Sequence, residues 1–404
     1  MTRQVVVVGA GIVGIGVARE LADRGVHVTV LDRFPGRALG STAYAPGFVG
    51  LYNDAPVLTA FARASADIYA ECAPSGFTRT GGLELATTAA GAEEVARRVD
   101  AARSADLEAR LLDAARLPDS VAAFVDTTRV VAAGLFSDDG SADVVPVWDA
   151  LRGDAIARGA HIFPGREVVG LDRVDGRLVV ATSSGEVFHA DDVVLAGGVW
   201  GPTAAAWTGL ELPLFPVAHP YVYSGAAAAH RPGPFVRWAE HHTYARVHGD
   251  RLGIGSYEHR PVPVAQGDLD GGAGLPWPAQ FSEVVTAAQQ LLRAEARFAP
   301  AQRVNGVFAM TPDNMPFLGR HPGMDGVWIA EAIWVTHAAG AAAALTDALV
   351  GGGDLPAGLA VDRFAGSGLT ELRDNALRLY NDIYAAETAV TDVSPPDDRR
   401  IVGR

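Results

Sequence analysis

The sequence predicts an α/β fold in which a domain built on a parallel β-sheet is joined to a second, α+β domain built on a mixed or antiparallel sheet. Three observations predict it. The chain opens with an apolar strand, a glycine-rich turn and a helix, and two later apolar strands also run into small residues. Residues 242–257 alternate like a β-hairpin. The length of 404 residues exceeds one typical core, which favours two domains.

The first elements follow the order of a dinucleotide-binding unit: an apolar strand at 4–8, a helix to about residue 24 and a second strand at 27–31. Gly9 permits the tight turn between strand and helix, and Gly11 lets a pyrophosphate approach the backbone. Gly14 lets the helix pack closely on the strand, and Asp32 can accept hydrogen bonds from a ribose. This complete order is far more specific than three glycines alone.

The following segments favour FAD over a nicotinamide cofactor. A nicotinamide domain would continue with alternating strands and helices, whereas residues 40–47 are small and polar and fit a loop beside a pyrophosphate or flavin ring. Residues 177–201 predict a hairpin, an acidic turn and a buried strand ending at Ala196. Residues 326–349 predict a strand, a turn and a helix with a small-residue face, with Thr336 as its N-cap. The positive end of that helix suits the flavin's pyrimidine edge.

The composition excludes several function classes. All 33 basic side chains are arginine, so lysine Schiff bases, P-loop lysines and kinase-type lysines are impossible. The net charge of −14 argues against nucleic-acid binding. The single cysteine, Cys72, cannot form an intramolecular disulfide and has no partner for a zinc site, so we expect no metal and a cytoplasmic location. The most apolar stretch, 327–352, contains Glu331, His337 and Asp347, so no membrane span is expected.

Seven motifs, spread over essentially the whole chain, carry a family resemblance; they lie at 9–14, 40–47, 81–88, 216–222, 248–261, 311–319 and 330–340. In these motifs the sequence resembles the D-amino-acid oxidase superfamily of FAD-dependent amine oxidoreductases. It is most similar to the flavin half of dimethylglycine oxidase, dimethylglycine dehydrogenase and sarcosine dehydrogenase. The resemblance implies a Rossmann-like FAD-binding domain of the glutathione-reductase type.

The same resemblance implies the oxidation of a secondary or tertiary amine next to a carboxylate, such as an N-methyl amino acid. Hydride would pass to flavin N5, and the iminium would hydrolyse, with hydrogen peroxide formed if O2 is the acceptor. Two alternatives stay open. The protein can be an amine dehydrogenase that passes electrons to a protein or quinone acceptor. It can also be the flavin subunit of a complex with a separate folate-binding or biosynthetic partner.

The motifs and the resemblance together predict contacts with FAD for Gly9, Gly11, Ile12, Val13, Gly14, Asp32, Arg33, Ser41, Thr42, Ala43, Tyr44, Phe48, Val168, Ala196, Gly197, Trp200, Val335, Thr336, His337 and Ala338. The sequence departs from the family at Tyr44, where several members carry a histidine that is covalently attached to the flavin. We therefore expect non-covalent FAD. Longer members continue into a folate-binding domain, which we expect this chain to lack. Some related oxidases use a lysine to help oxygen accept electrons, and that route is closed here.

A hairpin around residues 248–251 predicts the substrate side. With a two-residue turn, Arg246 lies opposite Gly253 and Tyr244 opposite Gly255. One face then carries polar groups over a floor cleared by glycines, which suits a flat ring and a small anion; its polar members are His242, Tyr244, Arg246 and Tyr257. Arg246 is the candidate for binding a carboxylate through both guanidinium nitrogens. A structural ion pair is the alternative, and Arg251, Arg260 and Arg320 are rivals.

His219 lies in an apolar strand with Tyr221 and Tyr223 on the same side, and Pro220 argues for an edge strand or a bulge. His219 and Tyr257 match the histidine and tyrosine that lie near flavin and substrate in the family, so both are predicted to be catalytic. A structural role is the alternative for each.

The predicted FAD-binding domain is discontinuous and comprises 1–52, 140–215 and 306–385. The predicted substrate domain comprises 53–139 and 216–305, and 386–404 form an extended tail. The charged helical segment 91–104 is predicted to be a solvated helix face.

Overall fold

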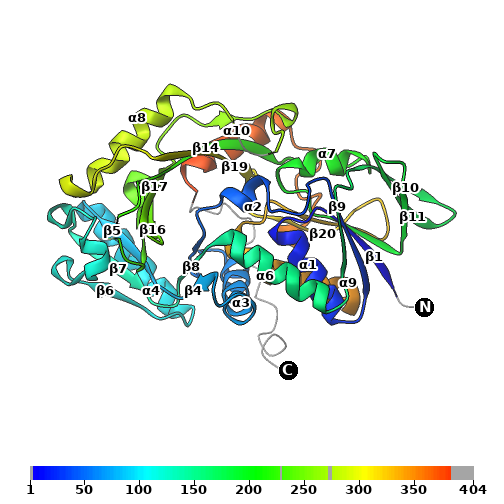
Figure 1. Cartoon of the computed structure of the whole chain (residues 1–404), viewed down its shortest axis with the longest axis horizontal. Helices are drawn as coiled ribbons and strands as arrows, with labels where there is room; N and C mark the ends of the chain where they lie inside the picture. Colours follow the sequence, from blue (N-terminus) through cyan, green and yellow to red (C-terminus); the bar gives the residue numbers. More distant parts are fainter. Residues whose placement is uncertain (1–2, 228–229, 272–274, 384–404) are drawn as a thin grey trace.

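Two large β-sheets lie side by side in the computed structural model, which describes residues 3–227, 230–271 and 275–383 (Figure 1). The predicted tail at 386–404 lies outside the described residues. The two kinds of sheet confirm the predicted fold class.

Within the described chain, the first sheet has six strands in the order β20, β21, β13, β1, β2, β9; their bounds are Phe317–Arg320, Val327–Glu331, Asp192–Leu195, Gln4–Val8, His27–Asp32 and His161–Pro164. All pairs are parallel except β20 with β21. The valines of β1 are buried because both faces of the sheet are covered. Val5 and Val7 pack on the side of the helices at 12–23 and 338–351, and Val6 and Val8 pack on the side of the antiparallel strands at 168–190.

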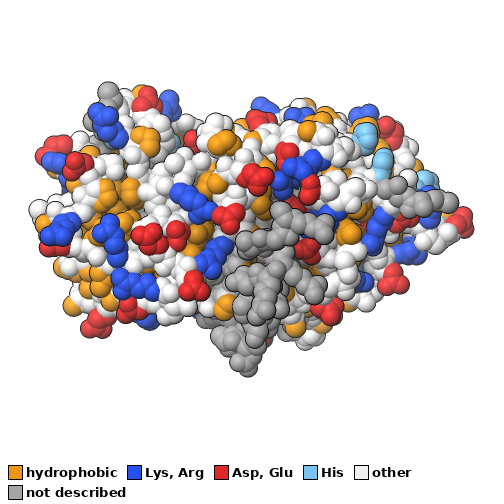
Figure 2. All heavy atoms as spheres, turned by 90° about the horizontal axis from the view of Figure 1, so that it is seen from below, with side chains coloured by type: hydrophobic (Ala, Val, Ile, Leu, Met, Phe, Trp, Pro, Cys, Tyr) orange, Lys and Arg blue, Asp and Glu red, His pale blue; other side chains and the backbone are white. Residues whose placement is uncertain are grey.

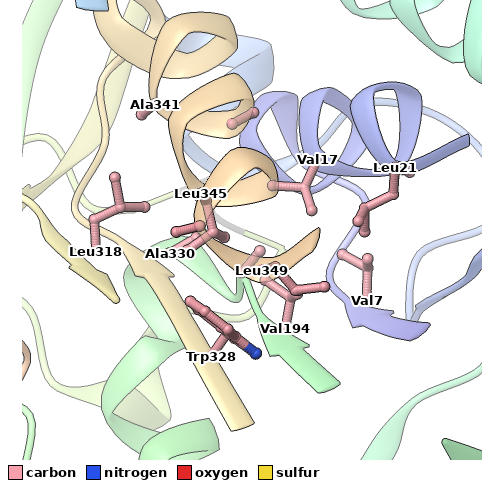
Figure 3. Close-up of a cluster of buried hydrophobic side chains, with 14 of the residues drawn as sticks. Val7, Val17, Leu21, Val194, Leu318, Trp328, Ala330, Ala341, Leu345 and Leu349 are labelled. Carbon is pink, nitrogen blue, oxygen red and sulfur yellow. The ribbon is translucent and has the colours of Figure 1, made fainter. Parts of the chain in front are cut away.

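Helices α1 (Ile12–Asp23) and α9 (Ala338–Gly351) pack on this sheet, with α3 (Pro56–Cys72) and α6 (Val144–Ala157) beside them. The predicted small-residue face of α9 is present: a Cβ added to Gly16 of α1 would lie 3.1 Å from the Ala342 Cβ. Figure 3 shows the apolar core between α1, α9 and strands β1, β13 and β21, with Trp328 lying across it.

The second sheet, counted over the described residues, has nine strands in the order β18, β14, β17, β16, β15, β5, β7, β6, and β19 also pairs with β14. Strands β18 and β17 pair with successive segments of one edge of β14, and β19 pairs with its opposite edge. Their bounds are Val262–Pro263, Phe215–Tyr223, Arg251–Ser256, Thr243–His248, Phe235–Trp238, Gly82–Ala86, Ala132–Phe136, Ala109–Leu112 and Gln302–Met310. Only β15 and β5 pair in parallel among these strands. Helices α4 (Ala89–Ser104), α5 (Asp119–Ala122), α8 (Ala279–Ala288) and α10 (Leu369–Asn381) accompany it.

The hairpin register is as predicted, with Arg246 opposite Gly253 and Tyr244 opposite Gly255. The prediction of an edge strand or bulge at Pro220 is wrong, because β14 is an interior strand. Pro220 is tolerated because it falls between the segment of β14 that pairs with β18 and the segment that pairs with β17.

Smaller elements complete the fold: β10 (Val168–Val174), β11 (Arg177–Thr182) and β12 (Val187–Ala190) form an antiparallel sheet, and β3 (Phe48–Val49), β8 (Gly140–Ala142) and β4 (Phe77–Thr78) form another. The hairpin expected within 177–201 is β11 and β12. The loop expected at 40–47 begins instead with a short helix, α2 (Gly40–Tyr44), and α7 (Gly201–Ala206) follows the turn after β13.

The division into domains stays a prediction, but three elements bear on its boundaries. Residue 306 lies inside β19, which pairs with β14 of the second sheet along its whole length. Helix α10 packs on the same two strands, and α3 packs on α9 of the first sheet.

The surface carries mixed charge. Arginine and acidic side chains alternate over the face shown in Figure 2, with small apolar areas between them. Within the described residues, none of the helices combines the length and the apolar character that spanning a membrane requires.

Candidate active site

A large cavity lies between the two sheets, and it encloses about 2640 Å³ when its opening to solvent is counted. Its lining runs from the turn between β1 and α1 to strands β14 and β19 of the second sheet, so the cavity suits an extended ligand. The structure brings together in its lining the predicted residues Gly9, Gly11, Ile12, Val13, Asp32, Arg33, Ser41, Thr42, Tyr44, Phe48, Val168, Ala196, Gly197, Trp200, Val335, Thr336, His337, His219 and Tyr257. Gly14, Ala43, Ala338 and Arg246 are outside the lining.

Backbone packing explains two of the glycines in and after the turn between β1 and α1. Gly9 has φ +105°, and a Cβ there would lie 2.3 Å from the carbonyl oxygen of Ala196. A Cβ on Gly14 would lie 1.9 Å from the Gly9 carbonyl oxygen, so Gly14 serves helix packing. At Gly11 the nearest atom is Thr42 Oγ1, 3.3 Å from the added Cβ. The turn is therefore tight at both ends and open in its middle, where it faces the cavity.

The N-terminus of α1 points its backbone donors toward this opening. The N-cap residue, Gly11, has no side chain that could cap the helix, and the first turn carries no acidic residue. The N–H of Ile12 donates to Thr42 Oγ1 at 3.1 Å. Cationic side chains from other segments also reach the lining, namely Arg33, Arg37, Arg152 and Arg166. Helix dipole and guanidinium groups together favour an anion such as a diphosphate.

Asp32 lies at the end of β2 and accepts two backbone hydrogen bonds, from Ala10 N at 2.6 Å and Phe34 N at 2.7 Å. These bonds fix both carboxylate oxygens at the cavity edge and leave lone pairs for a ribose hydroxyl. Burial raises the pKa of Asp32, and the two backbone bonds partly oppose this rise.

The segment before α9 lies over the same cavity. Thr336 is not the predicted N-cap: α9 begins after His337, and the Thr336 hydroxyl donates instead to the Phe48 carbonyl at 2.8 Å. That bond joins the two segments predicted to contact the flavin. Burial lowers the pKa of His337 to about 4, so this imidazole is neutral at pH 7.

Aromatic side chains from the second sheet line the other end of the cavity. The His219 ring centroid lies 4.5 Å from that of Tyr257, 5.0 Å from that of Phe308 and 5.7 Å from that of Tyr244. The expected floor cleared by glycines is occupied by tyrosines. A Cβ on Gly253 would lie 2.2 Å from the Tyr221 hydroxyl, and a Cβ on Gly255 would lie 2.6 Å from the Tyr244 hydroxyl. The tyrosine rings therefore occupy the space that the missing glycine side chains leave free, and these rings line the cavity.

His219 is held at both ring nitrogens. Its Nδ1 lies 2.6 Å from the Tyr380 hydroxyl and its Nε2 lies 2.6 Å from the Tyr244 hydroxyl. Burial lowers the pKa of His219 well below its ordinary value, and nearby His259 adds to this effect. His219 is consequently a neutral imidazole at the cavity wall.

Arg246 lies behind the wall and serves packing in this structure. Its Nη1 donates to the carbonyls of Gly47 and Ala142 at 3.0 Å, and its Nη2 lies 2.6 Å from Asp143 Oδ1. The predicted pairing of Arg246 with Gly253 is confirmed, but the long side chain reaches the start of α6 and is not part of the cavity lining. His242 also lies away from the wall, with a left-handed backbone and its Nε2 3.4 Å from Glu258 Oε2.

A buried charge cluster in the wall escaped the sequence analysis. Glu84 accepts from Arg98 Nε at 2.9 Å and from Arg237 Nη2 at 2.6 Å, and both arginines line the cavity. Arg98 lies in the segment 91–104 and is only 7 % exposed, so the prediction of a wholly solvated face is wrong there. The sequence signal that could have revealed this cluster is Glu84, an acidic residue inside the otherwise apolar segment 82–86.

Asp139 adjoins the same cluster. Burial raises the pKa of Asp139 to about 7, although Arg237 opposes the rise. Its Oδ1 accepts from Leu51 N at 2.8 Å, and its Oδ2 has no hydrogen-bond partner among the described residues. Burial also disfavours the charge of Glu84, but Arg98 and Arg237 prevail and hold its pKa below the ordinary value. Arg98 Nη1 also lies 3.8 Å from Asp54 Oδ2. The cluster therefore holds two arginines and three carboxylates, of which Asp139 is partly protonated near pH 7.

Comparison with known proteins decides the family. Residues 4–348 match the family model described as DAO, FAD dependent oxidoreductase. The chain belongs to this family. The suspected superfamily, the enzyme class and the FAD cofactor are thereby confirmed.

Relatives in the DAO family include the mitochondrial dimethylglycine dehydrogenase of Mus musculus, which is 26 % identical over 380 residues, 86 % of this chain and 42 % of the relative. The 4-methylaminobutanoate oxidase (formaldehyde-forming) of Paenarthrobacter nicotinovorans is 27 % identical over 338 residues, 80 % of this chain and 40 % of the relative. The chain thus spans about two fifths of the length of these relatives. The solved L-proline dehydrogenase of P. horikoshii has a TM-score of 0.80 and 22 % identity, covering 90 % of this chain and 98 % of that one.

The residues present fit the family's cofactor. The N-terminus of α1 and the arginines in the same lining suit a diphosphate, Asp32 suits a ribose, and the segments joined by Thr336 and Phe48 suit a flat ring. FAD supplies a two-electron acceptor when it is bound.

Proposed function

We propose that this protein oxidises a secondary or tertiary amine that carries a carboxylate, such as an N-methyl amino acid, and that it holds FAD non-covalently. The carbon–nitrogen bond becomes an iminium, which water hydrolyses. The observation that carries the proposal is the end of the cavity beside the second sheet, where a neutral histidine, aromatic rings and the guanidinium group of Arg237 line one space.

Each of these features has a use with such a substrate. Aromatic faces attract N-methylated cations, and Tyr244, Tyr257 and Phe308 supply such faces. His219 is neutral and can help to remove the proton of an ammonium group. Arg237 lines the cavity and is the cationic group we assign to the carboxylate, in place of Arg246, because the guanidinium fork matches a carboxylate.

An anaerobic screen tests the proposal. Purified yellow protein is mixed with a panel of methylated amino acids without oxygen, and the visible flavin absorbance is followed. Loss of this absorbance with at least one N-methyl amino acid supports the proposal. A flavin that no amine in the panel bleaches, but that dithionite bleaches, contradicts it.

A second candidate function is an amine dehydrogenase. The sequence contains no lysine, and both His219 and His337 are neutral because burial lowers their pKa values. The groups that would most readily provide a positive charge for oxygen reduction are therefore missing or uncharged. Hydrogen peroxide formation equal to amine consumption supports an oxidase, whereas rapid reduction of an artificial dye with little peroxide supports a dehydrogenase.

A further inference from the structure

A chain of hydrogen bonds leads from the cavity wall into the second sheet and ends on the backbone. Tyr244 contacts His219, and His219 contacts Tyr380 of α10, each at 2.6 Å. The Tyr380 hydroxyl lies 2.8 Å from His259 Nε2, and His259 Nδ1 lies 3.0 Å from the carbonyl oxygen of Arg260. Tyr380 and His259 are outside the cavity lining, and none of the motifs assigned them a role.

The last contact fixes the direction of all the others. A carbonyl oxygen can only accept, so His259 carries its proton on Nδ1 and offers Nε2 as an acceptor. The Tyr380 hydroxyl therefore donates to His259, and its oxygen accepts from His219 Nδ1. His219 Nε2 is then the acceptor for the Tyr244 hydroxyl. The Ala218 carbonyl, 3.3 Å from the Tyr380 hydroxyl, competes more weakly because it is farther away.

We propose that Tyr380 and His259 extend His219 into a proton relay, which takes the proton that an ammonium substrate loses before oxidation and holds it on His259. This inference rests on the proposed function. In one passage the substrate proton reaches the Tyr244 oxygen while the Tyr244 proton moves to His219 Nε2. The His219 Nδ1 proton moves to the Tyr380 oxygen, and the Tyr380 proton moves to His259 Nε2. The ammonium becomes a neutral amine, His259 becomes an imidazolium, and no electrons are transferred.

The surroundings favour His259 over His219 as the group that holds the proton. His219 is enclosed by the aromatic rings of Tyr244, Tyr257, Tyr380 and Phe308, whereas His259 adjoins the exposed carboxylate of Glu258. Burial lowers the pKa of His259, but the Arg260 carbonyl and Glu258 oppose this effect. From helix α8 the Phe281 ring contacts His259, with 4.7 Å between the ring centroids, and Arg260 is exposed.

Helix α10 holds this geometry in place. Asn381 Nδ2 donates to the carbonyls of Tyr257 at 2.6 Å and His259 at 3.0 Å, so the residue beside Tyr380 anchors both ends of the 257–259 turn. Tyr380 and His259 are thus positioning residues that act through His219.

The tautomers are measured first, by NMR on FAD-bound protein with 15N-labelled histidine. Signals of His219 and His259 are assigned by their absence in His219→Gln and His259→Gln. The relay predicts a proton on Nδ1 of both rings between pH 6 and 8, and a changed His219 signal in Tyr380→Phe. A proton on Nε2 of either neutral ring in the wild-type protein overturns the relay.

The pH dependence of anaerobic flavin reduction is measured second, with an amine that reduces the wild-type protein. Tyr380→Phe keeps the ring and removes the hydroxyl; it should slow reduction about 10–100-fold near pH 7 and regain the wild-type rate at high pH, where the amine is already neutral. His259→Gln should show the same profile. Tyr223→Phe, a change on β14 outside the cavity lining, should follow the wild-type profile.

The outcomes separate the two claims. Slowing by the same factor at every pH shows a structural role for Tyr380 and overturns the relay alone. Failure of every amine to reduce the wild-type flavin overturns the proposed function and, with it, the use of the relay.

Discussion

Arg237 Nη2 donates a 2.6 Å hydrogen bond to Glu84 Oε1 in the wall of the cavity. The guanidinium of Arg246, nine positions further along the chain, instead binds Asp143 and two backbone carbonyls. The two arginines therefore differ in their surroundings, and this difference can be tested by matched substitutions.

Arg237→Lys keeps the positive charge and removes the planar fork. We expect the KM of a carboxylate-bearing amine to rise about tenfold or more, which corresponds to about 1.4 kcal/mol. The KM of the analogous amine without a carboxylate should stay the same. Arg246→Lys is the matched control and should lower the free energy of unfolding without selective loss. A selective loss in Arg246→Lys alone would restore the assignment made from the sequence.

Asp139→Asn tests the protonation of the buried cluster. The pKa of Asp139 is raised to about 7, so between about pH 4 and 7 the folded protein holds a proton that the unfolded chain has lost. This stabilising contribution is complete below pH 4 and is lost as pH rises through 7. The variant should therefore gain stability over the wild-type protein with rising pH, by up to about 1.4 kcal/mol per pH unit in this window. Urea unfolding at pH 5 and pH 8 measures the gain, and Asp138→Asn is the control.

Gly11→Ala tests the nucleotide end of the cavity. Because the added methyl would point into the space beside Thr42, we expect FAD affinity to fall about tenfold or more while the flavin-free protein changes stability by less than about 1 kcal/mol. Fluorescence titration with FAD measures the affinity. Gly153→Ala in α6 has open space at its Cβ and should leave FAD binding unchanged. Equal FAD affinity in both variants would place the diphosphate elsewhere.

Denaturation in acid tests the attachment of the flavin. Tyr44 is a tyrosine where several family members carry a flavin-linked histidine, so we expect all FAD to appear in the supernatant. Absorbance spectra of the supernatant and the pellet give the distribution. Flavin retained by the pellet of the wild-type protein but released by Tyr44→Phe would instead indicate a tyrosyl bond.

Local patterns predicted the nucleotide motif, both sheet types and the hairpin register, because each depends on residues close together in sequence. The charge cluster could not be predicted in this way. Glu84, Arg98, Asp139 and Arg237 meet only because β15 pairs with β5 and α4 packs beside them. Pro220 was misjudged for a similar reason, since the gap between β17 and β18 exists only in the assembled sheet. The contacts of the Arg246 guanidinium could not be predicted either, because the alternation along a strand does not show where a long side chain ends.

The most direct measurement of the central claim is the single-turnover rate of anaerobic flavin reduction in wild-type protein, Tyr257→Phe and His219→Gln. We expect both variants to bind FAD normally and to be reduced about 100-fold more slowly by the best amine substrate, because proton removal at this site contributes at this scale. Unchanged reduction rates in both variants would contradict the claim that the amine is oxidised at the His219 end of the cavity.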